Sequence, residues 1–379
     1  MSHENSWCVL FVPALLCYLA ILTSTVNNRA VDGVIASDIF SESGRLLFAK
    51  NTAIEVLATG LEWSEGPLWV DDAEAGAGYL VFSDTITNKI WKYDEGNGLF
   101  TIGKSLYINE SGCSVNETHC AEVFEPGSNG ITRYPGSDVV DLVLCQHGER
   151  AITMIYGNGT RKVIADRYKG KKLNSPNDVV WSDENNLYFT DPPYGLYDKE
   201  TMSELVNEEI GHYGVYMIRK EDVETALRTG VPTENVVLLD NSLSRPNGIA
   251  FSPDYRHMYV ANSDSTNPIW LVFDVDRKSG LLKNRRVLAD ATEFMDESEE
   301  HSAISFPDGL KVSSDGIIVS SAPGGIFLLS PGGSLIQKIK IPRRVSNVAF
   351  GADGYLFVTA QDAVLRIKSA LESGIEPRA

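Results

Sequence analysis

One sequence unit recurs six times between about Glu65 and Lys368, and this repetition constrains the fold more than any other feature of the chain. Each copy has a short polar loop beside Gly, Asp or Pro, an alternating hydrophobic run, a turn rich in Asp, Asn and Gly, and a second run. Alternation interrupted by such turns is typical of β-hairpins. The copies begin at Ser64, Ser128, Ser175, Arg245, Phe306 and Val345.

Radial repetition of such a unit is the architecture of a β-propeller, so the sequence predicts an all-β, six-bladed β-propeller. A β-sandwich would not repeat its loop motif in register, and the repeats of a parallel β-helix are much shorter. We expect the propeller at residues 56–370, after a leader at 1–30 and a lead-in at 31–55, with a tail at 371–379. Three segments outside the pattern are expected to be surface insertions: Thr101 to Gly127, Thr201 to His212 and Ala291 to Ser302.

The leader contains an almost unbroken apolar run from Trp7 to Leu22. This run is shorter than the roughly 20 residues of a membrane span, so it predicts a secretory signal peptide, with a signal anchor as the alternative. Glycosylation sequons at Asn109, Asn116 and Asn158 fit the same compartment. We therefore expect a glycoprotein that is secreted or lumenal, or that is anchored by an uncleaved N-terminal segment.

The cysteines fit an oxidising compartment. Cys113 and Cys120 lie seven positions apart in one predicted loop and can close a small disulfide. Cys145 would remain odd, and its apolar neighbours predict a buried free thiol, with a reactive nucleophile as the alternative.

The chain carries 51 acidic and 33 basic side chains, a formal net charge of −18, and its longest basic cluster is Lys169 to Lys172. This balance argues against nucleic acid as a partner. The acidity serves solubility or attracts cations. The nucleophile motif Gly-x-Ser-x-Gly is absent, which argues against serine-hydrolase chemistry. We expect a monomer that binds a small molecule and contacts no membrane beyond an N-terminal anchor.

Equivalent loop positions of a propeller converge on its axis, so the same slot of each repeat predicts a site. Four slots lie beside Pro and together offer two carboxylates and two amide oxygens, a hard donor set that suits Ca²⁺, Mg²⁺ or Mn²⁺. Asn-Gly and Asp-Gly are also common turn dipeptides. Considered alone, each slot residue could therefore simply form a turn, which is the alternative interpretation. The predicted central metal ligands are Glu65, Asn177, Asn247 and Asp308; the slots of the other two repeats hold Asn129, expected to contact substrate, and Asn347.

Six phrases extend the pattern: E-G-P-L-W from Glu65, N-S-P-N-D-V-V from Asn174, Y-F-T-D-P-P-Y-G from Tyr188, R-P-N-G-I-A-F from Arg245, F-P-D-G-L from Phe306 and S-N-V-A-F from Ser346. They resemble the gluconolactonase branch of the family that also contains regucalcin (senescence marker protein) and luciferin-regenerating enzyme. The resemblance covers about Val56 to Lys368. It implies a six-bladed propeller that holds one divalent cation, usually Ca²⁺, and hydrolyses small lactones.

By this resemblance Glu65, Asn247 and Asp308 hold the cation, and Asn177 is a fourth ligand, direct or through water. Mg²⁺, Mn²⁺ or Zn²⁺ are alternatives to Ca²⁺. An Arg that contacts substrate in regucalcin, two residues before that Asn, is replaced here by Ser175. The preference for sugar lactones therefore does not transfer to this chain.

A cation of this kind polarises a lactone carbonyl and lowers the pKa of a water molecule, so the predicted reaction is lactone opening by metal-activated water. Asp308 is expected to be the general base, with pure ligation as the rival role. His147, at the end of a predicted strand, is expected to bind a substrate hydroxyl or shuttle a proton, or else to be structural. Asp191 and Tyr194 are expected near substrate, or as turn formers.

Two other functions remain open at this level. The first is a propeller that binds a ligand or partner without catalysis. The second is hydrolysis of other esters, such as organophosphates, because a fold does not fix a substrate.

Overall fold

The computed structural model describes residues 31–34, 36–39, 47–48, 52–71, 78–94, 105–114, 116–137, 140–203, 205–295, 306–351 and 354–371. Within these ranges no helix is long and apolar enough to cross a membrane. The expected leader at residues 1–30 lies outside the described residues, as do residues 372–379 of the expected tail.

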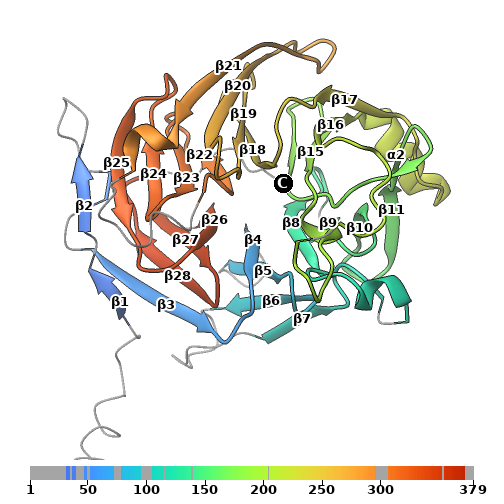
Figure 1. The fold of residues 1–379 in the computed structure, drawn as a ribbon, viewed down its shortest axis with the longest axis horizontal. Coiled ribbons are helices and arrows are strands. Elements are labelled where there is room, and N and C mark those ends of the chain that lie inside the picture. Colours follow the sequence, from blue (N-terminus) through green and yellow to red (C-terminus); the bar gives the residue numbers. More distant parts are fainter. Residues whose placement is uncertain are drawn as a thin grey trace, which may run out of the picture.

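Six antiparallel sheets surround a central axis, which confirms the six-bladed propeller expected from the repeats (Figure 1). In blades one to four the strands follow sequence order outward from the axis. Blades one and two comprise β4 (Ser64–Val70), β5 (Tyr79–Asp84), β6 (Lys89–Asp94) and β7 (Ser105–Asn109), then β8 (Ser128–Arg133), β9 (Leu142–Gln146), β10 (Ala151–Ile155) and β11 (Arg161–Ala165). Blades three and four comprise β14 (Val179–Trp181), β15 (Leu187–Asp191), β16 (Gly214–Ile218) and β17 (Val236–Asp240), then β18 (Pro246–Phe251), β19 (His257–Asn262), β20 (Ile269–Val275) and β21 (Leu282–Asp290).

Blades five and six take outer strands from the N-terminal part of the chain. Blade five comprises β22 (Leu310–Val312), β23 (Ile318–Ala322), β24 (Gly325–Leu329) and β25 (Leu335–Lys340), with β2 (Ala36–Ile39) at its edge. Blade six comprises β26 (Val345–Phe350), β27 (Tyr355–Ala360) and β28 (Ala363–Lys368), followed by β3 (Ala53–Thr59) and β1 (Val31–Val34). The segment expected as a lead-in at 31–55 therefore contributes strands to two blades.

Antiparallel pairing of β3 with β28 closes the ring. Glu55 lies opposite Arg366 in this ladder, and Arg366 Nε donates to Glu55 Oε2 at 2.9 Å. Because β3 leads into β4 of blade one, the chain itself then connects blade six to blade one. The ring is thus closed by backbone pairing inside blade six.

Burial falls from the axis outward. The second strands β5, β9, β15 and β23 are buried along their whole length, whereas most of β21 is exposed. The strict alternation expected from sequence is absent in these inner strands because each blade is covered on both faces by its neighbours. Aromatic pairs join adjacent blades: Trp69 stacks on Phe357, and Tyr188 meets Phe251 edge to face, each with ring centres 5.0 Å apart.

The remaining elements lie between strands. The hairpin of β12 (Arg167–Tyr168) and β13 (Lys171–Lys172) follows blade two, and α2 (Lys220–Thr229) connects β16 to β17. Three short 3₁₀ helices are η1 (Thr118–Ala121), η2 (Tyr194–Leu196) and η3 (Ala291–Phe294). Of these, η1 lies in the first predicted insertion, which borders the site described next.

Candidate active site

The starts of the six innermost strands surround one cavity of about 440 Å³. Every blade contributes to its lining, so residues far apart in the chain, such as Glu62 and Gln361, meet there. The predicted site residues in this lining are Glu65, Asn129, Asn177, Tyr194, Asn247 and Asp308. The other lining residues are Glu62, Trp63, Ile86, Phe124, Glu125, Met202, Ser263, Phe306, Arg344, Val345 and Gln361.

Backbone bulges aim the slot residues at this cavity. In blades one, two and four the register between the first two strands shifts just at the slot: between Glu65 and Leu68, between Ser128 and Ile131, and between Pro246 and Ile249. A bulge bends a strand and redirects its side chains. In these three blades the polar slot side chains therefore leave the pleat of the sheet and face the cavity, whereas Asn347, beside a similar shift in blade six, does not line it.

Glycines beside the slots let neighbouring blades approach closely. A Cβ added to Gly66, whose φ is +50°, would lie 2.0 Å from the carbonyl oxygen of Asn129. A Cβ on Gly248 would lie 2.4 Å from the carbonyl oxygen of Asp308, and Gly248 donates its N–H to that same oxygen at 3.1 Å. These glycines set the spacing between the slot residues of adjacent blades.

Two carboxylic acids in the cavity have perturbed titration. Burial is the main cause that raises the pKa of Glu65, which is 2% exposed, and the N–H of Gly66 at 3.1 Å opposes the shift. Burial and the charge of Glu65 together hold the pKa of Asp308 well above its usual range, and the Arg344 guanidinium opposes this. Simultaneous ionisation of Glu65 and Asp308 is therefore disfavoured unless a positive charge lies between the two carboxylates.

The donor set of the cavity fits a hard cation. Asn129 Oδ1 and Asp308 Oδ1 are buried and have no hydrogen-bond partner among the described residues. The amide of Asn247 donates to Ser263 Oγ at 3.0 Å, which leaves its oxygen for another contact. Buried oxygens without donors, next to acids whose charges repel, are the arrangement that a cation with oxygen ligands would satisfy.

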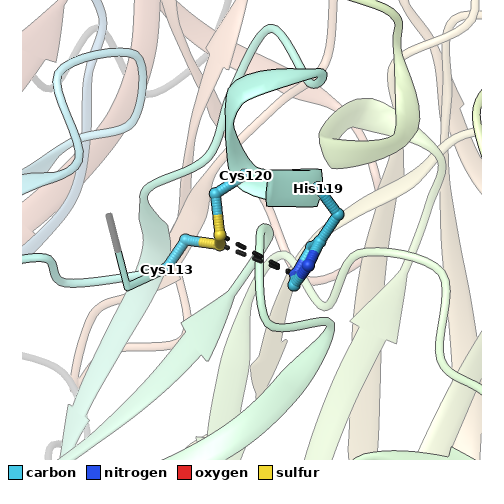
Figure 2. Close-up of side chains that lie close together, drawn as sticks. All are labelled: Cys113, His119 and Cys120. Carbon is cyan, nitrogen blue, oxygen red and sulfur yellow. Dashed lines mark hydrogen bonds between the residues drawn. A yellow bond between two sulfur atoms is a disulfide. The ribbon is translucent and has the colours of Figure 1, made fainter. Parts of the chain in front are cut away.

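A second cluster with metal-ligand chemistry lies in the first insertion (Figure 2). His119 Nε2 is 3.8 Å from Cys113 Sγ and 3.7 Å from Cys120 Sγ. The two cysteines are joined as a disulfide, as their spacing suggested, so neither offers a thiolate to a metal. Cys145 is a free buried thiol, which confirms that expectation.

His147 and Asp191 do not line the cavity. Each is fully buried behind its wall, at or just after the end of the second strand of its blade. Asp191 Oδ2 accepts from the backbone N–H of Asn174 at 2.9 Å, and burial raises the pKa of Asp191 to about 7. Tyr194 does reach the cavity; its hydroxyl is buried without a hydrogen-bond partner in the described chain.

Sequence reasoning missed Glu125 and Arg344. Glu125 lies in the insertion before blade two, where no repeat slot marks it, and its Oε2 is 3.3 Å from His147 Nδ1. Arg344 precedes β26, with its guanidinium carbon 4.8 Å from the ring centre of Trp63. Its position directly before a repeat start was the available signal.

The cavity continues into an open hollow of about 630 Å³. Met202, Ser263 and Phe306 line both spaces. The far ends of the innermost strands enclose a separate apolar cavity of only about 50 Å³, with Lys311 as its one charged lining residue. The cavity of about 440 Å³, where the polar slot residues meet, is therefore the candidate active site.

Residues 63–362 match the family described as the SMP-30/Gluconolactonase/LRE-like region. A gluconolactonase from Zymomonas mobilis is 33% identical over 359 residues, which are 92% of this chain and 92% of that protein. The solved structure of a gluconolactonase from Xanthomonas campestris superposes with a TM-score of 0.69 and 24% identity, covering 91% of this chain and 99% of that one. A calcium-binding regucalcin from Agrobacterium tumefaciens superposes with a TM-score of 0.59 and 16% identity, covering 85% and 95%.

Proposed function

The chain belongs to the SMP-30/gluconolactonase/LRE-like family, and from this premise we propose that it opens a small lactone with the help of a bound divalent cation, Ca²⁺. Lactone hydrolysis rests on one observation above all, the 33% identity to a gluconolactonase along 92% of both chains. The cavity is consistent with this activity because it combines apolar walls with a few converging polar groups, as small-molecule sites do.

Glu65, Asn177, Asn247 and Asp308 would hold the cation, and their oxygen donors favour Ca²⁺ over softer metals. The calcium-binding regucalcin that shares the fold supports the same choice. When bound, the ion would supply positive charge that polarises the lactone carbonyl and makes water more acidic.

The protein's own residues would orient and stabilise the reactants. The unpartnered hydroxyl of Tyr194 is a hydrogen-bond donor in reach of a bound lactone, and Arg344 provides the positive charge that suits the carboxylate of the product. Trp63, Phe124 and Phe306 would give the cavity apolar surface that limits the access of water. The space shared with the neighbouring hollow admits lactones larger than a single sugar ring.

Proton release from glucono-δ-lactone and from a panel of γ-lactones tests this function, with and without a chelator. We expect turnover that disappears with the chelator, returns with added Ca²⁺, and is lost together with calorimetric Ca²⁺ binding in Asp308→Ala. Ca²⁺ binding without turnover of any lactone would instead favour a ligand-binding propeller. Turnover that survives complete metal removal contradicts the proposed cation dependence.

We also propose that the protein acts in the secretory pathway or outside the cell. The Cys113–Cys120 disulfide fits an oxidising compartment. The asparagines of all three sequons, Asn109, Asn116 and Asn158, are exposed and so accessible to glycosylation. Digestion with a glycosidase that removes N-linked glycans should lower the mass of protein isolated from its native host and so increase its electrophoretic mobility. An unchanged mass contradicts this proposal.

A further inference from the structure

A buried histidine and a carboxylate form a pair at the wall of the cavity. His147 is 0% exposed, and both of its ring nitrogens lack a hydrogen-bond partner in the described chain. Its Nδ1 lies 3.3 Å from Oε2 of Glu125, whose side chain is 16% exposed. Glu125 lines the cavity, so one end of the pair meets the reaction space and the other is enclosed.

The backbone holds both members of the pair rigidly. His147 N–H donates to the carbonyl of Gly127 at 3.0 Å, which ties the end of β9 to the segment that carries Glu125. Gly195 packs directly on His147, because a Cβ there would lie 2.4 Å from His147 Cβ and 2.9 Å from the ring atom Cγ. The Cys113–Cys120 disulfide braces the same insertion, and Cys113 Cβ lies 2.5 Å from where a Cβ on Gly148 would stand.

Besides the exposed Glu62, three carboxylates line the cavity, those of Glu65, Glu125 and Asp308, and they differ in their availability as bases. Glu65 and Asp308 would both be engaged as ligands, which lowers their basicity. Glu125 is outside the ligand set, yet it is near enough that its charge contributes to the raised pKa of both other acids. A carboxylate in this position can exchange protons with a water or a leaving group.

We propose that Glu125 is the general base and acid of lactone opening and that His147 is the residue that positions it. This inference rests on the proposed function and assigns to Glu125 the proton transfer that the sequence assigned to Asp308. Contacts of a catalytic pair are often long or poorly aligned without substrate and tighten when it binds, which fits the 3.3 Å separation.

The Glu125 carboxylate takes one proton from water while the water oxygen bonds to the lactone carbonyl carbon and the carbonyl π pair moves onto its oxygen. When that pair returns, the ring C–O bond breaks and the departing ring oxygen takes the proton back from Glu125. One water has been added, a hydroxy acid is formed, and Glu125 is again a carboxylate.

Substitution of Glu125 tests the catalytic role in the full, Ca²⁺-loaded protein. We expect Glu125→Gln to lower kcat about 100-fold or more, the usual size of such proton transfer, with KM and calorimetric Ca²⁺ affinity within about 3-fold of wild type. Formate should restore part of the activity of Glu125→Ala, because a small carboxylate can occupy the vacated space. Glu122→Gln is the matched control: it removes an exposed carboxylate of the same insertion that does not line the cavity, and kcat should not change.

The positioning role of His147 is tested by a measurement that would not change if His147 only supported the fold. His147→Gln should lower kcat about 10-fold at unchanged KM and Ca²⁺ affinity, and should have no further effect in the Glu125→Gln background, since residues acting as a unit are not additive. If His147→Gln does not fold, formate rescue of Glu125→Ala still decides the catalytic assignment.

Several outcomes overturn the inference while leaving the proposed function standing. One is a wild type that hydrolyses lactones together with a Glu125→Gln variant of nearly unchanged kcat. Another is a Glu125→Ala variant that loses Ca²⁺ affinity and thermal stability in parallel and does not respond to formate. A wild type that hydrolyses no lactone overturns the proposed function, and the assignment of Glu125 with it.

Discussion

Asn347 donates a hydrogen bond from Nδ2 to Oε2 of Glu65 at 3.4 Å, across the junction between blade six and blade one. Asn347 occupies the slot of its own repeat but lies outside the cavity lining, and its Oδ1 accepts the backbone N–H of Val348 at 2.8 Å. The sixth slot therefore orients a proposed cation ligand instead of providing one. This contact also explains why one of the six repeats departs from the pattern of cavity-facing slots.

Cation binding should release protons near neutral pH. Burial, together with repulsion from neighbouring carboxylates, raises the pKa of both Glu65 and Asp308 in the metal-free protein, so protons compete with the cation for these oxygens. Raising the pH removes the competing protons, and the apparent Ca²⁺ affinity should therefore increase with pH through the neutral range. Calorimetric titration in two buffers with different ionisation enthalpies measures the protons released.

For that titration, Asp308→Asn is the comparison variant, and we expect it to bind Ca²⁺ more weakly and to release fewer protons. Binding enthalpies that agree between the two buffers for wild type would show that no proton leaves, and would contradict the electrostatic description of the cavity.

Close contact between blades should make Gly248 sensitive to one added methyl group. In Gly248→Ala the new Cβ would lie 2.4 Å from the carbonyl oxygen of Asp308, so the backbone that carries this proposed ligand must move. We expect Ca²⁺ affinity to fall about 10-fold or more, because cation sites tolerate little displacement of their ligands. Gly157→Ala is the control, since its Cβ would meet its first neighbour only at 3.5 Å, and its affinity should match wild type.

Asp191 should give the protein a stability that depends on pH. Its native pKa of about 7 lies above the ordinary value of 3.8 because the side chain is fully buried. Between these two values the folded protein keeps the proton and the unfolded chain loses it, so this group's contribution to stability falls as pH rises from about 4 to 7. Asp191→Asn should remove that slope.

The measurement is urea unfolding of wild type and Asp191→Asn between pH 4 and 8. The stability difference in favour of the variant should grow by on the order of 3 kcal/mol up to about pH 7 and then stay constant. A stability difference that does not change between pH 4 and 8 would mean that Asp191 is ionised in the folded protein across this whole pH range.

Loss of the Cys113–Cys120 disulfide should destabilise the protein modestly. The bond closes a loop of seven residues, for which the chain-entropy description gives about 2 to 3 kcal/mol. Cys113→Ser should therefore unfold at lower urea concentration, and reductant should shift wild type by the same amount. Cys145→Ala is the control. Because Cys145 is a free thiol, the difference in unfolding midpoint between this variant and wild type should be the same with and without reductant.

The fold could be predicted from the sequence because each blade is specified locally. Turn residues and hydrophobic runs mark every hairpin, and the slot residues Glu65, Asn177, Asn247 and Asp308 converge on one cavity as expected for equivalent loops around an axis. Strands β1 and β2 and the start of β3 escaped prediction, as did β7, because the segment from Thr101 to Gly127 was wrongly expected to be entirely a surface insertion. They lie at the outer edges of blades, where backbone pairing suffices and no repeat motif is needed.

The errors of placement at the site have a physical cause as well. His147 and Asp191 follow or end second strands, which lie one layer outside the axis, so their side chains stop behind the wall that the first strands form. Glu125 reaches the cavity from an insertion that belongs to no repeat. Periodicity says nothing about such a loop, because its path depends on contacts such as the 3.0 Å bond from His147 N–H to Gly127.

Closure by pairing of β3 with β28 means that the ring has no obligatory starting point. Both ends of the propeller chain belong to one blade, so a linker could join them and new termini could be opened elsewhere, for instance in the exposed turn at Asn158 between β10 and β11. Such a circular permutant keeps every strand pair and every cavity residue while changing the order in which the blades are synthesised. The site therefore depends on the closed ring of blades, and does not depend on the blade at which the chain begins.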